Sequence, residues 1–273
     1  MKRCVVILAS VVLCISTWRA ALAQTAVTEC GQVVPRGQSG QLVGDLDCSA
    51  LENHAVTLDS GAKLFLNGFT LTGYPASTSL AVVRCLRRCR IEGPGTITGG
   101  NYGVRGEPPW PPRGHTNIRI RGTTVSGNLG LGVSGRWLKL KIEGSTITNN
   151  LYGAGGDRVK IEGSTITNNL GGVGGRARIT ESTVSNNDWY GVFSFHGAVI
   201  EDSEIVDNGL DPDCPAENGH RCGDILLGET PRLVGTTTCG TSLNLSAEGF
   251  GCYETWGVCA EDPEFGLCEQ PQP

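Results

Sequence analysis

The stretch Ile142-Glu-Gly-Ser-Thr-Ile-Thr-Asn-Asn150 decides the fold, because it returns almost unchanged as Ile161-Glu-Gly-Ser-Thr-Ile-Thr-Asn-Asn169. Looser copies cover residues 179–187 and 200–208. A repeat of about 20 residues is typical of proteins that stack one small unit on the next, so that each unit buries its apolar side against its neighbours. The sequence therefore predicts a linear stack rather than a globular core.

Each repeat has a central apolar residue, which we call the anchor, and a second apolar residue about five positions earlier. The anchors are Leu71, Ile97, Val125, Ile147, Ile166, Val184 and Ile205. The earlier positions are Leu66, Ile91, Ile120, Ile142, Ile161, Ile179 and Ile200. Asparagines follow the later anchors at a constant distance, at Asn128, Asn150, Asn169, Asn187 and Asn208. Stacked in register, these amides predict a ladder of hydrogen bonds from unit to unit.

Three short segments in each repeat read as strands. Residues 138–142 alternate apolar and charged side chains, residues 146–148 flank the anchor with threonines, and Gly-Val pairs such as Gly132-Val133 form the third. Alternation with a period of two and β-branched residues favour extended structure. Three strands per unit, stacked in parallel, predict an all-β, single-stranded, right-handed parallel β-helix of about eight coils.

Residues 64–73, together with the repeated Gly-Ser-Thr-Ile-Thr-Asn-Asn, resemble the pectin-lyase-like superfamily of right-handed parallel β-helix repeat proteins. Cys239-Gly-Thr-Ser and Trp256-Gly-Val-Cys259 resemble the closing segment of its secreted bacterial members. The resemblance covers roughly residues 30–260. That superfamily includes pectate and alginate lyases, polygalacturonases, uronan epimerases and non-catalytic surface proteins, so the resemblance implies a fold more strongly than an activity.

The first 23 residues read as a secretory signal peptide. Lys2 and Arg3 precede an apolar run, and Ala21-Leu-Ala23 precedes the expected cleavage site. The run is too short to span a membrane, and no later stretch is apolar enough. Cleavage changes the formal net charge from −5 to −8, because it removes Lys2, Arg3 and Arg19. An acidic exported protein argues against bulk nucleic-acid binding but leaves room for a local basic patch.

The mature chain keeps ten of the twelve cysteines, and an even number in an oxidising compartment predicts disulfides. The expected pairs are Cys30–Cys48, Cys85–Cys89, Cys214–Cys222, Cys239–Cys259 and Cys252–Cys268. The predicted organisation is a signal peptide over residues 1–23, an N-terminal cap over 24–50, the β-helix over 51–235, and a cysteine-rich C-terminal cap and tail over 236–273.

Basic residues recur at fixed distances before the anchors and form two predicted columns on one strand face. One contains Arg119, Lys141, Lys160 and Arg178, and the other contains Lys139, Arg158 and Arg176. Arg84, Arg88 and Arg90 are expected near the same line. Like charges stacked about 4.8 Å apart repel, so Glu143, Glu162 and Glu201 are expected as partners. The columns are candidates for a track that binds an acidic polymer, or else an ordinary solvated face with local ion pairs.

Aromatic residues and threonines offer further surface candidates. Trp110 stands between prolines, which stiffen the loop, and is a candidate for stacking on a sugar ring or for covering apolar surface. Trp189 and Tyr190 pose the same choice. The threonines that flank the anchors form Thr-x-Thr pairs; some ice-binding β-helices resemble this arrangement, although threonine is also a good exposed strand residue.

Complete catalytic motifs are missing. The clustered carboxylates that the resemblance to polygalacturonases would require are absent, and Asp211-Pro-Asp-Cys214 matches the epimerase motif only in part. His54, His115, His196 and His220 fall in unrelated coils, with His196 nearest the basic columns. No cofactor is predicted; Ca²⁺ is conceivable through Asp157, Asp188, Asp202 and Asp207, which lack a recognisable ligand spacing.

These features predict an exported, monomeric β-helix protein that binds an acidic polysaccharide or acts at a cell surface without catalysis. One alternative is a lyase or epimerase that acts on a polyuronate such as pectate or alginate, with Lys141, Lys160, Arg158 and Arg178 as candidates for neutralising the uronate or removing its proton. A second alternative is a structural envelope protein without a small ligand.

Overall fold

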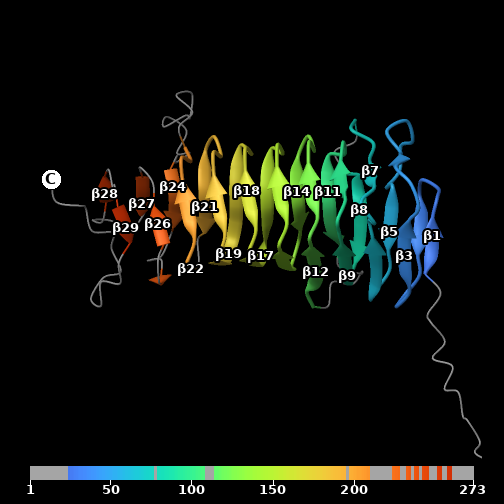
Figure 1. Cartoon of the computed structure of the whole chain (residues 1–273), viewed down its shortest axis with the longest axis horizontal. Coiled ribbons are helices and arrows are strands. Elements are labelled where there is room, and N and C mark those ends of the chain that lie inside the picture. Colours follow the sequence, from blue (N-terminus) through green and yellow to red (C-terminus); the bar gives the residue numbers. More distant parts are fainter. Residues whose placement is uncertain are drawn as a thin grey trace, which may run out of the picture.

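The computed structural model describes residues 24–76, 79–107, 114–194 and 197–209, followed by short strands at 223–227, 232–234, 237–239, 242–245, 251–253 and 257–259. Every described element is a β-strand. Figure 1 shows these strands stacked along one long axis, from β1 (Thr25–Val27) at one end to β28 (Gly251–Tyr253) and β29 (Gly257–Cys259) at the other.

The strands form three ladders, because each coil contributes one strand to each ladder before the chain climbs to the next coil. The first ladder contains β2 (Gln32–Val34), β5 (Val56–Leu58), β8 (Ala81–Leu86), β11 (Tyr102–Glu107), β14 (Leu131–Gly135), the first parts of β17 (Tyr152–Glu162) and β19 (Gly171–Thr180), β21 (Tyr190–Ser194), β24 (Gly223–Leu227) and β27 (Ser242–Leu245). The second contains β1, β3 (Ser39–Leu42), β6 (Ala62–Phe65), β9 (Arg88–Glu92), β12 (Thr116–Arg121), β15 (Leu138–Glu143), the second parts of β17 and β19, β22 (Ala198–Glu201) and β25 (Arg232–Val234). The third contains β4 (Leu46–Asp47), β7 (Thr70–Thr72), β10 (Thr96–Thr98), β13 (Thr124–Ser126), β16 (Thr146–Thr148), β18 (Thr165–Thr167), β20 (Thr183–Ser185), β23 (Glu204–Val206), β26 (Thr237–Cys239) and β29.

The predicted anchors form one continuous column in the third ladder. The register pairs Leu71 with Ile97 and continues coil by coil to Ile205. All seven anchors are fully buried, so the apolar face of the alternating pattern lines the interior of the stack. The residues on either side of each anchor, mostly threonines, are aligned in the same register and point to the other face of the ladder.

The second apolar column is confirmed except at its first member. Leu64, rather than Leu66, pairs with Ile91, and the column then continues through Ile120 and Ile142. Leu66 is also buried, but it lies in the turn after β6, where its N–H donates to Glu92 O. Counting back from the anchor therefore fails here, because the turn in this coil differs from the turns in later coils.

The asparagine ladder is confirmed. Asn128, Asn150, Asn169 and Asn187 each donate a side-chain N–H to the side-chain oxygen of the next asparagine, over 2.7–3.1 Å. The last member, Asn208, donates to Asp224 Oδ1 at 2.8 Å. All are buried, so the ladder satisfies amides that would otherwise be costly to hold away from water.

A second, serine ladder was not predicted. The hydroxyl oxygens of Ser145, Ser164, Ser182 and Ser203 accept the backbone N–H of the equivalent residue one coil earlier, over 3.1–3.2 Å. Each hydroxyl in turn donates to a carbonyl two residues before it. The Gly-Ser-Thr part of the repeat is therefore structural.

The two ends differ in how they pair. Strands β1–β4 already pair in parallel with later strands, so the described chain contains nine successive coils instead of the expected eight. At the far end β26 and β27 pair antiparallel with β29 and β28. This change of direction ends the regular parallel stacking of the coils. The division into caps and β-helix at residues 50 and 235 remains a prediction.

Two of the expected disulfides are present, Cys30–Cys48 and Cys85–Cys89, with Cα–Cα distances of 5.6 and 5.9 Å. The first ties the residue after β4 to the turn before β2, and the second joins β8 to β9. The pairs Cys214–Cys222, Cys239–Cys259 and Cys252–Cys268 involve side chains that the structure does not describe. The predicted signal peptide also lies outside the described residues.

Candidate functional site

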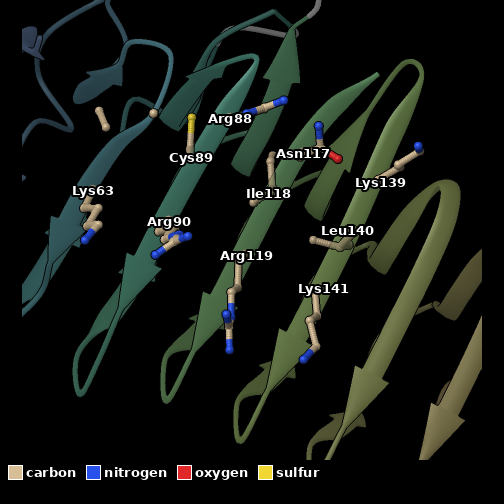
Figure 2. Close-up of a pocket in the computed structure, with 12 residues that line it drawn as sticks. Lys63, Arg88, Cys89, Arg90, Asn117, Ile118, Arg119, Lys139, Leu140 and Lys141 are labelled. Carbon is tan, nitrogen blue, oxygen red and sulfur yellow. The ribbon is translucent and has the colours of Figure 1, made fainter. Parts of the chain in front are cut away.

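The outward face of the second ladder carries two rows of basic side chains, because the strands alternate apolar residues inward with charged residues outward. The first row, in register from coil to coil, is Lys63, Arg90, Arg119, Lys141, Lys160 and Arg178. The second row is Arg88, Asn117, Lys139, Arg158 and Arg176. Figure 2 shows the beginning of both rows crossing neighbouring strands side by side. We call this surface the cationic face.

The register extends the predicted columns and corrects one residue. Lys63 belongs to the first row but was missed, because its coil does not repeat the motif spacing. Arg84 does not lie near the line: it is on β8 in the first ladder, paired with Arg105, and it forms an ion pair with Glu107 at 2.6 Å. The chain turns between β8 and β9 at Arg87, whose φ is 74°, so Arg84 and Arg88 belong to different faces.

Glutamates flank the first row and pair with four of its six members, Arg119, Lys141, Lys160 and Arg178. Arg119 Nη2 donates to Glu143 Oε1 at 3.0 Å, and Lys141 Nζ lies 2.6 Å from the same oxygen. Glu162 forms ion pairs with Lys160 at 3.0 Å and with Lys141 at 3.4 Å, and Arg178 pairs with Glu201 at 2.7 Å. These are the glutamates expected as partners.

These contacts change the pKa values of the carboxyl groups. Partial burial opposes ionisation of Glu143, but hydrogen bonds from Arg119 and Lys141 hold its pKa below the ordinary value. Lys160 and Lys141 likewise lower the pKa of Glu162. The hydrogen bond to Glu143 raises the pKa of Lys141. At neutral pH, therefore, Glu143 and Glu162 stay ionised and remain paired with Arg119, Lys141 and Lys160.

The second row is free. Arg88, Lys139, Arg158 and Arg176 make no ion pair with any other residue that the structure describes. The three arginines are exposed and Lys139 is half-buried. Unpaired charges at this spacing repel one another, so a bound anion would lower their energy.

The cationic face is shallowly hollowed over β6, β9, β12 and β15. The hollow has the buried Cys89, Ile118 and Leu140 beneath it and basic side chains of both rows around it. Lys63, Arg90, Arg119 and Lys141 cross it in one line, with Arg88 and Lys139 in the other (Figure 2). The residues around the hollow come from four successive coils, so it extends along the stack and suits an extended ligand better than a compact one.

The cationic face differs in charge from the rest of the chain. From β6 to β22, its strands carry eleven basic residues, namely Lys63, Arg88, Arg90, Arg119, Arg121, Lys139, Lys141, Arg158, Lys160, Arg176 and Arg178. They carry five acidic residues, namely Glu92, Glu143, Asp157, Glu162 and Glu201. The whole chain has 22 basic against 27 acidic residues, so the positive charge is concentrated on one side of a negatively charged protein.

The remaining candidates are not brought together. Trp110, His196, His220 and residues 211–214 lie outside the described residues. His54 Nδ1 accepts the N–H of Ala81 at 3.0 Å, and burial lowers the pKa of its imidazole, which indicates a structural role. Among the described residues, no group of three or more His, Cys, Asp or Glu side chains is placed to hold a metal ion.

The arrangement can neutralise an acidic ligand, but Lys141 is a poor proton acceptor. A general base must be neutral at the working pH, whereas contact with Glu143 raises the pKa of Lys141 and keeps it protonated. Lys160 forms an ion pair with Glu162 at 3.0 Å. Of the candidates for a lyase reaction, Arg158 is unpaired and Arg178 pairs with Glu201.

Comparison with known proteins supports the fold. Residues 113–231 match the family model described as a right handed beta helix region. No curated protein and no solved structure matches the chain. Within the described residues, no helix has the length and apolar character needed to span a membrane. The family match and the three parallel ladders together identify the chain as a right-handed parallel β-helix repeat protein.

Proposed function

We propose that the protein binds an acidic polysaccharide along its cationic face and does not cleave it. The observation that carries this proposal is the second row: Arg88, Lys139, Arg158 and Arg176 are aligned in register and have no carboxylate partner among the described residues. A solvated face stabilised only by local ion pairs would leave no such row. In the neighbouring first row, by contrast, glutamates lie next to the lysines and form ion pairs with them.

The geometry favours a linear ligand that lies along the stack. Adjacent parallel strands are about 4.8 Å apart, so a polymer running along the axis meets a new cation at nearly every coil. Many weak contacts of this kind add up to useful affinity although each exposed contact is small. The acidic remainder of the molecule would repel the same polymer and so confine it to this face.

An extracytoplasmic location fits this ligand. The disulfides Cys30–Cys48 and Cys85–Cys89 are of a kind that persists in oxidising compartments, and the sequence predicts a signal peptide cleaved after Ala23. We propose that the protein is exported and acts as a monomer on a polysaccharide outside the cytoplasm.

Removing charge from the second row is expected to weaken binding. In Arg158→Thr/Arg176→Thr, threonine keeps the strand and no glutamate loses a partner. At about 1 kcal/mol for each cation near a polyanionic surface, the affinity for polygalacturonate should fall about 30-fold. Elution from immobilised polygalacturonate should then need less salt, while neither protein is retained on neutral dextran.

A matched control separates a local site from net charge. Thr96→Glu/Thr146→Glu also lowers the net charge by two, but on the third ladder, which already carries Glu204 in the same register. This control should be retained almost like the wild type. Equal losses in both double variants would overturn the site, and unsaturated sugar products in the eluate would show a lyase instead.

Releasing the first row is expected to strengthen binding. Glu143→Gln/Glu162→Gln frees Arg119, Lys141 and Lys160 from their carboxylates. Elution from the polymer should shift to higher salt, more than in Glu29→Gln/Glu52→Gln, which removes two exposed carboxylates from the first coils.

Acidification of the wild type should also strengthen binding. The pKa values of Glu143 and Glu162 are lowered, so their ion pairs persist at neutral pH and are lost as the pH falls through these two pKa values. Dextran sulfate, which stays charged in acid, is the ligand for that measurement.

A further inference from the structure

Trp137 lies beside the cationic face in an unfavourable backbone conformation. It follows β14 in the turn before β15, its φ is 56°, and it is 50 % exposed. A positive φ is tolerated by glycine and asparagine but is unusual for a bulky residue. Among the described non-glycine residues with positive φ, Trp137 is the sole aromatic one. Strain of this kind, combined with exposure of an apolar ring, is more typical of binding sites than of cores.

The surrounding structure fixes the backbone of Trp137 without burying its side chain. Its carbonyl accepts the N–H of Thr116 at 3.0 Å, and the next residue, Leu138, is fully buried. An indole used for packing would bury most of its surface, because burial is what stabilises a large aromatic side chain. Half of this one is left in water.

The indole is accompanied by charged and polar groups. The Arg136 guanidinium lies 6.0 Å from the centre of the ring, and Lys139 of the second row follows two residues later. On the coils before and after, His115 Nδ1 and Asp157 Oδ2 approach to 3.5 Å. His115 Nδ1 itself is buried without a hydrogen-bond partner among the described residues. An aromatic ring and a guanidinium are therefore neighbours at one edge of the cationic face, and the adjacent coils carry a histidine and an aspartate.

We infer that Trp137 and Arg136 form a subsite for one acidic pyranose ring of the polysaccharide. The C–H face of a pyranose is flat and apolar and packs on the face of an indole, while its carboxylate binds the adjacent guanidinium. The following acidic groups of the polymer then meet Lys139 and Arg158 in the second row. This inference rests on the proposed function and deepens it: the ring-stacking site selects polysaccharides over polyanions that have no ring.

The test compares two polyanions on one pair of variants. Trp137→Asn removes the indole but suits the positive φ, so the turn is kept and thermal stability should not fall. Loss of the stacking surface should lower the affinity for polygalacturonate at least about fivefold, which corresponds to about 1 kcal/mol. Linear inorganic polyphosphate has no ring, and its affinity should be unchanged. Trp137→Phe, which restores an aromatic face, should recover part of the loss for polygalacturonate alone.

The outcomes separate the subsite from the proposed function. If the wild type binds both polymers and Trp137→Asn weakens both equally or neither, the subsite is wrong and the cationic track stands. If Trp137→Asn loses stability, the indole has a packing role and the subsite is again wrong. If the wild type binds neither polymer, the proposed function fails and the subsite fails with it. A selective loss for polygalacturonate supports both.

Discussion

Replacing Asn169 with alanine is expected to destabilise the protein by about 4 kcal/mol, because several buried hydrogen-bonding groups lose their partner at once. Asn169 Oδ1 accepts both the backbone N–H and the side-chain N–H of Asn150, at 3.0 and 3.1 Å. Its own amide donates to Asn187 Oδ1, Ile147 O and Thr167 O. The residue is 1 % exposed, so water cannot replace these contacts without opening the coil.

The measurement should combine global stability with a local readout. The free energy of unfolding in urea reports the total loss. Hydrogen exchange at the Asn150 amide reports the specific cause, since that N–H bonds directly to the deleted side chain. In a stack where each coil contacts mainly its neighbours, the faster exchange should be greatest around Asn150 and fall off along the axis.

The adjacent residue supplies a control of the same type. Asn168 is exposed and has a φ of 53°, a conformation that glycine adopts freely. Asn168→Gly should therefore change the stability by less than about 1 kcal/mol. A loss in Asn169→Ala no greater than in Asn168→Gly would contradict the ladder as a major source of stability.

The interior of the stack was predictable because its signals are periodic. The anchors recur in nearly identical surroundings, and each has a β-branched or leucine side chain that must face inward once a strand forms. The asparagines recur with them, so the ladder followed from spacing alone. Its end on Asp224 could not be predicted, because the chain between Asn208 and Asp224 does not repeat the motif.

The corners of the coils were less predictable. Turns change length without changing the pattern on the strands, which is why Leu66 was aligned in place of Leu64 and why Arg84 was placed on the wrong face. The pairing of individual cations was also only partly visible. The glutamates were expected as partners, but the register and side-chain distances were needed to show that they serve the first row and leave the second row free. The isolated Trp137 carried no repeat signal.

Replacing Gly172 with alanine is expected to cost about 3 kcal/mol or more, because the added methyl group meets the backbone of the next coil. A Cβ at this position would clash with Gly191 O and would lie 3.1 Å from Asn187 Nδ2. Gly132 and Gly153 are in the same situation. A Cβ at Gly132 would lie 2.6 Å from Gly153 O, and a Cβ at Gly153 would lie 2.7 Å from Gly172 O. The glycines of the Gly-Val pairs thus set how closely the coils stack.

Gly174 of the same strand is the matched control for Gly172. A Cβ at Gly174 would have no atom within 4 Å, so Gly174→Ala adds the same methyl group at an open position. It should be neutral or stabilise slightly, because alanine loses less backbone entropy than glycine on folding. Thermal unfolding of the two variants beside the wild type makes the comparison. Since the clash at Gly172 also presses on Asn187, its variant should lose protection at Asn169, whose backbone N–H donates to Asn187 Oδ1 at 3.1 Å. Equal stability of Gly172→Ala and Gly174→Ala would show that the coils can move apart at no cost, and close stacking would then not be what requires glycine there.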